Sequence, residues 1–102
     1  MKFVFAVLFA FGVLLSGNVA ASEKLAQSSG CMTCHAIDRK VIGPSYKEIA
    51  AKYSNDKSAE ANLVKKVKAG GSGVWGSTPM PPNAHVKEDD IKAMVAWMLT
   101  LK

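Results

Sequence analysis

The hydrophobic positions of the chain form one continuous run, which is followed by several amphipathic segments. The continuous run covers residues 3–15, comes directly after Lys2 and is followed by small and polar residues. A positive start, a short apolar stretch and a small-residue exit are typical of a secretory signal peptide. The run is shorter than the roughly 20 apolar residues that span a bilayer. We therefore predict a signal peptide over 1–21, cleaved after Ala21, and a single domain at 22–102; an uncleaved anchor is the alternative.

Four later segments are candidates for helices. The clearest is the last one, where apolar residues recur at positions i, i+3, i+4, i+7 and i+8 counted from Ile91. No stretch alternates apolar and polar side chains for long enough to predict a sheet. The pattern therefore predicts an all-α domain with its helices packed round a ligand. The helices are expected over about 23–31, 46–53, 59–69 and 87–101.

Three connecting segments separate these helices. The first, 36–45, is irregular, and the second, 54–58, is expected to be a turn that caps the following helix. The third, 70–83, is rich in glycine and proline, which predicts a loop without regular structure. A loop of this length in a small domain is usually functional.

The chemistry of the chain is concentrated in the motif Cys31-Met32-Thr33-Cys34-His35. Two cysteines three positions apart, followed directly by histidine, are typical of covalent haem attachment. Each thiol can add to one haem vinyl group, and the adjacent imidazole can bind the iron as an axial ligand. In an exported protein, two free cysteines would otherwise tend to form a disulfide. We therefore predict that Cys31 and Cys34 attach one haem c and that His35 binds its iron.

A sixth ligand would make the iron an electron-transfer centre rather than an open binding or catalytic site. Met80 is the favoured candidate, because a proline on each side restricts the backbone that holds its weakly binding thioether. The alternative is a methionine that only packs on the haem. His85 is the main rival ligand, unless it is a solvated loop histidine. Met94 and Met98 are expected to fill the core.

Three further residues are candidates for contacts around the haem. The carbonyl of Pro44 could accept a hydrogen bond from Nδ1–H of His35 and so orient the ring. Trp75, in the glycine-rich loop, could donate its indole N–H to a haem propionate. Asn83 could donate its side-chain amide to the Met80 sulfur. For Pro44 and Asn83 the alternative is an ordinary turn residue.

Charge narrows the range of partners. The formal net charge of the 102 residues is +5 at pH 7, and removal of the signal peptide lowers it to +4, because Lys2 is the only charged residue there. A mildly basic surface favours redox proteins with acidic docking surfaces. The lysines are scattered and no nucleic-acid motif is present, so no nucleic-acid partner is expected. The lysines proposed for docking, with simple solubility as the alternative, are Lys40, Lys65, Lys66 and Lys68.

Four short sequences besides the haem motif identify a family. They are Ile42-Gly43-Pro44, Gly73-Val74-Trp75-Gly76, Pro79-Met80-Pro81-Pro82-Asn83 and Ala96-Trp97. With them the chain resembles, over about 22–102, the small bacterial class I cytochromes c of the cytochrome c-551/c-552 family. One departure is Lys87, which stands where the family usually has a serine-type helix cap, so the start of the last helix is weakly specified.

The resemblance implies a cytochrome c fold with crossed terminal helices, in which four to five helices wrap round one covalently attached haem. It implies that His35 and Met80 bind the iron, that Trp75 lies near a propionate and that Asn83 lies near the methionine sulfur. Members of the family are soluble periplasmic carriers, which pass electrons from quinol-linked complexes or other cytochromes to terminal oxidases, nitrite reductase or cytochrome c peroxidase. The resemblance therefore predicts a monomeric respiratory electron carrier in the periplasm, without stable membrane association after cleavage.

Two other classes of function compete with a carrier. A dithiol oxidoreductase would use Cys31 and Cys34 directly, but thioredoxin-like proteins need a βαβ pattern that this chain does not show. A haem peroxidase needs a vacant iron position, which Met80 would fill. The remaining alternative is a gas sensor or a permanent subunit of a reductase. We predict that the chain is not an enzyme.

Overall fold

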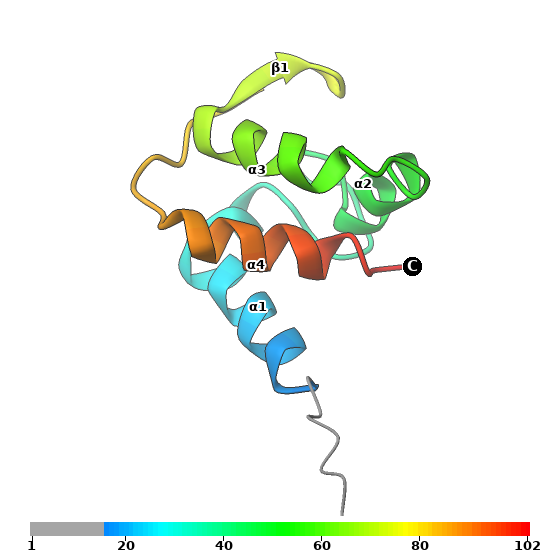
Figure 1. The fold of residues 1–102 in the computed structure, drawn as a ribbon. Helices are drawn as coiled ribbons and strands as arrows, with labels where there is room; N and C mark the ends of the chain where they lie inside the picture. Colours follow the sequence, from blue (N-terminus) through cyan, green and yellow to red (C-terminus); the bar gives the residue numbers. More distant parts are fainter. Residues whose placement is uncertain (1–15) are drawn as a thin grey trace, which may run out of the picture.

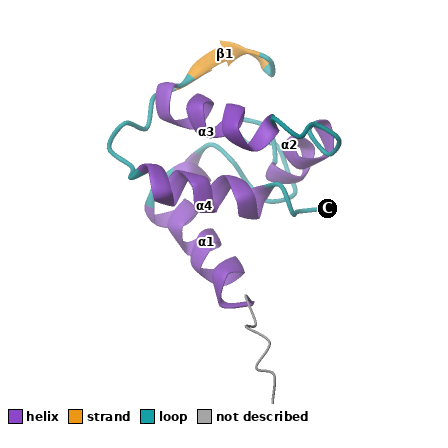
Figure 2. Ribbon diagram, viewed as in Figure 1, coloured by secondary structure: helices purple, strands orange, loops and turns teal. Residues whose placement is uncertain are grey.

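The computed structural model describes residues 16–102, so most of the predicted signal peptide lies outside the described residues and its cleavage after Ala21 stays a prediction. The described part contains four α-helices, one short 3₁₀ helix and a two-stranded hairpin (Figures 1 and 2). This composition agrees with the predicted all-α class. Within the same residues, no helix combines the length and the apolar character that a bilayer span requires.

Helix α1 covers Ser16–Ser28 and ends before the haem motif, although the sequence predicts a helix that reaches Cys31. The reason is Gly30, whose left-handed backbone, with φ of 82° and ψ of 5°, interrupts the helical path. The 3₁₀ helix η1, Cys31–Thr33, follows at once. The haem motif therefore begins in a tight turn rather than in the last turn of α1.

Helix α2 covers Tyr46–Lys52 and begins with a capping box. The Glu48 backbone N–H donates to Ser45 Oγ at 3.1 Å, and the Ser45 backbone N–H donates to a Glu48 carboxylate oxygen at 3.2 Å. Ser45 is only 2% exposed, whereas Glu48 is exposed, so this pair of hydrogen bonds is partly buried at the edge of the core. The capping box fixes where α2 starts, and with it the position of Tyr46.

Helices α3 (Ala59–Ala69) and α4 (Glu88–Met98) both begin without a capping side chain. The prediction that the turn at 54–58 caps α3 is wrong for Ser58. The Ser58 hydroxyl and backbone N–H both donate to the Asp56 carboxylate instead, at 2.6 and 2.9 Å. Lys87 at the start of α4 makes no capping bond either, in line with its departure from the family pattern.

The prediction that 70–83 has no regular structure is also wrong. Strands β1 (Gly71–Gly73) and β2 (Gly76–Met80) pair antiparallel into an exposed hairpin that leads up to Met80. A two-stranded ribbon has only edge strands, so a proline inside β2 removes no hydrogen bond that the ribbon needs. Glycine and proline content alone therefore does not exclude a short hairpin.

Helix α4 is the centre of the packing. Figure 1 shows α4 between α3 and α1, and it contacts α1, α2 and α3. The predicted core roles of Met94 and Met98 are confirmed, because both side chains are buried. The core cluster consists of Ala26, Tyr46, Ile49, Val64, Ile91, Met94, Val95, Trp97 and Met98.

Candidate haem site

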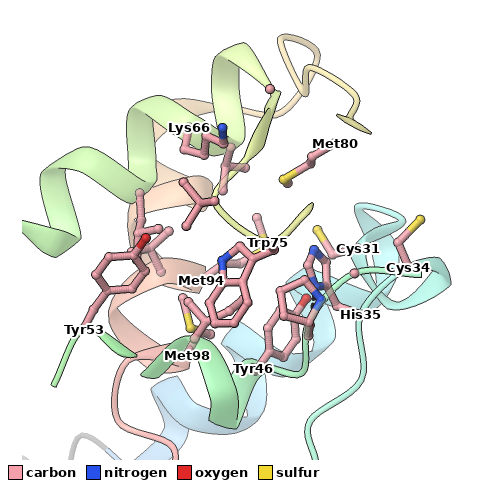
Figure 3. Close-up of a pocket in the computed structure, with 18 of the residues that line it drawn as sticks. Cys31, Cys34, His35, Tyr46, Tyr53, Lys66, Trp75, Met80, Met94 and Met98 are labelled. Carbon is pink, nitrogen blue, oxygen red and sulfur yellow. Dashed lines mark hydrogen bonds between the residues drawn. The ribbon is translucent and has the colours of Figure 1, made fainter. Parts of the chain in front are cut away.

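A mostly apolar cavity of about 360 Å³ opens between the haem motif, the hairpin and the helices α2, α3 and α4. Its lining contains six of the seven residues predicted to attach, ligate or contact the haem; these are Cys31, Cys34, His35, Pro44, Trp75 and Met80. Figure 3 shows the Met80 side chain reaching in from the hairpin, with Cys31 and His35 on the facing wall. Residues that are far apart in the sequence therefore meet in one apolar space.

The His35 ring is oriented by the loop that follows it. Its Nδ1 lies 2.7 Å from the carbonyl oxygen of Pro44, which also lines the cavity. A carbonyl only accepts hydrogen bonds, so Nδ1 carries the proton in this contact. Nε2 then keeps its lone pair free for a metal, which is the usual arrangement of a ligating histidine.

The same loop packs directly against the imidazole. The backbone N–H groups of Ile42 and Gly43 both donate to the carbonyl of Cys34, at 3.1 and 2.8 Å, and this folds the loop back over the motif. A Cβ atom added to Gly43 would lie 2.7 Å from Cε1 of His35. Only glycine therefore allows the chain to pass so close to the ring.

Tyr46 connects the histidine to the core. Its ring stacks on the imidazole, with 5.3 Å between ring centroids and 20° between the planes, and its other contact is an edge-on approach to Trp97 of α4. Burial raises the pKa of the Tyr46 hydroxyl, and burial likewise raises the pKa of the neighbouring Cys31 thiol. Before haem attachment, both groups are therefore protonated and neutral at pH 7.

The hairpin supplies the other wall of the cavity. Met80 is partly buried at the end of β2, whereas Trp75 at the hairpin turn is 43% exposed. Lys52 Nζ lies 5.6 Å from the centroid of the Trp75 ring, which holds the hairpin turn near the end of α2. His85, the rival ligand, is exposed and is not part of the cavity lining.

Asn83 lies outside the cavity lining. Its amide Nδ2 donates to the carbonyl oxygens of Val67 and Pro81, both at 3.1 Å. In this structure the amide is therefore engaged with the main chain rather than with the Met80 sulfur. The predicted hydrogen bond to that sulfur stays a prediction.

The donor set fits a haem better than a bare metal ion. Residues 16–102 contain no group of three or more histidine, cysteine, aspartate or glutamate side chains that could hold a metal ion by themselves. One imidazole nitrogen and one thioether sulfur facing an apolar cavity suit an iron whose other ligands come from a porphyrin. The two cysteines of the chain, both partly accessible, lie at this cavity.

Comparison with known proteins also indicates a haem protein. Residues 19–102 match the family model of cytochrome c. The chain is 57% identical over 84 residues to cytochrome c-551 of Allochromatium vinosum, covering 82% of this chain and 89% of the relative. It is 46% identical over 93 residues to cytochrome c-552 of Nitrosomonas europaea, covering 91% and 90%.

The fold agrees with that of a solved relative. The crystal structure of wild-type Nitrosomonas europaea cytochrome c552 matches with a TM-score of 0.76 and 49% identity, over 78% of this chain and 99% of that one. Membership of the family implies one covalently attached haem c. The chain therefore belongs to the cytochrome c family, as a small single-haem electron carrier of the c-551/c-552 type.

Proposed function

We propose that this protein carries single electrons in the periplasm and that His35 and Met80 are the axial ligands of its low-spin haem iron. The observation that carries the proposal is that these two side chains line the same apolar cavity, with the cysteines of the haem motif beside them. Two protein ligands leave no iron position for a substrate. The proposed role is therefore a carrier and not an enzyme.

The proposed attachment sites for the haem vinyl groups are Cys31 and Cys34, because the chain has no other cysteine. The bound haem would supply an iron that takes up and releases one electron. The protein would supply an oriented histidine, a soft thioether and an apolar surrounding, and these together favour the ferrous state and a high reduction potential. We further propose Trp75 as a propionate partner and Asn83 as a partner of the Met80 sulfur.

The first test is the absorption spectrum of the ferric protein, including the weak near-infrared band of sulfur-to-iron charge transfer. We expect this band in the wild type, together with no binding of carbon monoxide by the ferrous protein at neutral pH. In Met80→Ala the band should vanish, carbon monoxide should bind and the reduction potential should fall.

His85→Ala is the matched control, because His85 is exposed and lies outside the cavity lining. It should keep the band and the potential of the wild type. If Met80→Ala kept the charge-transfer band and its parent's potential, the proposed ligation would be wrong. Carbon monoxide uptake by the wild-type ferrous protein would instead favour an open iron site.

We also propose that the protein acts as a soluble monomer that docks on redox partners with acidic surfaces, within a respiratory chain that ends at an oxidase, a nitrite reductase or a peroxidase. Of the four lysines proposed for docking, Lys66 alone lines the cavity. Lys65 instead lines a second groove, whose other charged residues are Lys57, Glu60, Glu88 and Lys92. The structure therefore offers a direct comparison between two neighbouring lysines.

The docking proposal is tested by the salt dependence of electron transfer to an acidic partner protein. Lys66→Gln should lower the rate at low ionic strength and flatten its salt dependence more than Lys65→Gln does, because charges nearer the haem edge contribute more to steering. Equal salt dependence in the wild type and both variants would contradict an electrostatic docking role for these lysines.

A further inference from the structure

Gly70 ends α3 and turns the chain into the hairpin that carries Met80. Its backbone has φ of 72° and ψ of −168°. This combination lies in a region of backbone space that is essentially restricted to glycine. The junction between α3 and the hairpin therefore requires glycine for its conformation alone.

Gly70 also touches the segment around Met80. A Cβ atom on Gly70 would lie 2.5 Å from the carbonyl oxygen of Met80, 2.8 Å from the nitrogen of Pro82 and 2.9 Å from the carbonyl carbon of Pro81. All three atoms belong to the backbone, so no side-chain rotation can relieve the contact. The main chain at 80–82 rests directly on the α-carbon of Gly70.

Hydrogen bonds hold both sides of this contact at the last turn of α3. The Gly70 N–H donates to the carbonyl of Lys66 at 2.7 Å. On the other side, the Asn83 N–H lies 3.2 Å from the carbonyl oxygens of Val67 and Lys68, and its Nδ2 donates to Val67 as well. Neither segment can therefore move away without breaking a hydrogen bond.

We propose that Gly70 is a positioning residue for Met80, an inference that rests on the proposed ligation of the iron by Met80. Because glycine has no side chain, the segment 80–82 can lie close against the end of α3. This close contact sets how far the Met80 thioether reaches into the cavity. A β-carbon at position 70 displaces that segment. A thioether binds iron weakly, so a small displacement is enough for a competing ligand to replace it.

The test is an imidazole titration of the ferric, haem-loaded protein, followed by the loss of the sulfur-to-iron band. The variant is Gly70→Ala, and the matched control is Gly30→Ala. Gly30 has a similar φ of 82°, but a Cβ added there would meet no atom within 4 Å. We expect the affinity for imidazole to rise at least tenfold in Gly70→Ala and to change less than twofold in Gly30→Ala.

Three results would overturn the inference. The first is an unchanged imidazole affinity in Gly70→Ala, and the second is an equal rise in Gly30→Ala, which would indicate general backbone strain. The third is a wild type without the sulfur-to-iron band, and this result alone would also refute the proposed ligation. The failure of the inference and the failure of the proposed function are therefore distinguishable.

If the Gly70→Ala variant cannot be produced with haem bound, a measurement on the wild-type protein tests the contact instead. Proton NMR of the ferrous protein should show nuclear Overhauser effects between the Gly70 α-protons and the Pro82 δ-protons, because the backbones meet there. The presence of these effects supports the positioning contact, and their absence overturns it.

Discussion

The ring of Tyr46 lies nearly parallel to the imidazole of His35, and the same ring meets Trp97 edge-on at 5.7 Å. Tyr46 thus joins the histidine that faces the cavity to helix α4, which packs against α1, α2 and α3. The histidine is held by its own loop on one side, through Pro44 and Gly43, and by the core on the other. Orientation of the ring and packing of the core are therefore coupled.

Replacement of Tyr46 tests this coupling. Tyr46→Ala should lower the free energy of unfolding by about 3–5 kcal/mol, because it removes a large buried aromatic ring. Tyr46→Phe keeps the ring stack and removes only the hydroxyl group, so it should cost less than about 1.5 kcal/mol. Guanidinium unfolding of the haem-loaded protein measures both values. Equal losses in the two variants would mean that the ring stack contributes nothing.

Gly43→Ala should disturb the histidine without straining the backbone. Gly43 does not have a positive φ, so the added methyl group acts only through its contact with the His35 ring. Since Pro44 and Tyr46 hold that ring, we expect overpacking to cost about 1–3 kcal/mol. A shift of the reduction potential, measured by voltammetry, should accompany the loss of stability. If the free energy of unfolding and the reduction potential both stayed at their wild-type values, the His35 ring would be free to move away from the added methyl group.

Ser45→Ala should remove the capping box at the start of α2 and lower the free energy of unfolding by about 0.5–2 kcal/mol. Ser54→Ala is the matched control, because the Ser54 hydroxyl donates to the Ala51 carbonyl at the exposed end of the same helix. The control should stay within about 0.5 kcal/mol of the wild type. Thermal unfolding followed by circular dichroism compares the two. If Ser54→Ala lowered the free energy of unfolding as much as Ser45→Ala does, the capping box would have no special role in stability.

Asp56 should make stability depend on pH in the acidic range. Hydrogen bonds from the Ser58 hydroxyl and backbone N–H lower the pKa of the Asp56 carboxyl below its usual 3.8. A lowered folded-state pKa stabilises the protein above that usual value, and the contribution is lost as the pH falls through the lowered pKa. Ser58→Ala and Asp56→Asn should therefore both flatten the fall in stability below about pH 4. Acid titrations that superimpose on the wild type would contradict this role.

Local patterns predicted the parts of the molecule that depend on few residues. The spacing of Cys31, Cys34 and His35 indicates covalent haem attachment without any knowledge of the fold. The apolar repeat that starts at Ile91 likewise locates α4. The capping box was also readable, since a serine three positions before a glutamate is its ordinary signal.

Other features depend on contacts between distant segments and could not be read from the sequence. The direction of the Asn83 amide depends on where the carbonyl of Val67 lies after α3 has packed. The need for glycine at position 70 arises from a second segment that crosses it, ten positions further along. A glycine in a sequence shows that a turn is permitted, but it does not show which backbone passes over it.

The contacts that hold His35 all come from the next eleven residues or from the core face behind Tyr46, whereas Met80 comes from a hairpin much further along the chain. Short-range loops close faster than long-range ones. The local contacts of His35, with Gly43 and Pro44, can therefore form before the contacts that depend on α4 and on the hairpin. We therefore expect the His35 imidazole and the thiols of Cys31 and Cys34 to be available for haem attachment first. The Met80 thioether would reach the iron last, when the hairpin has folded.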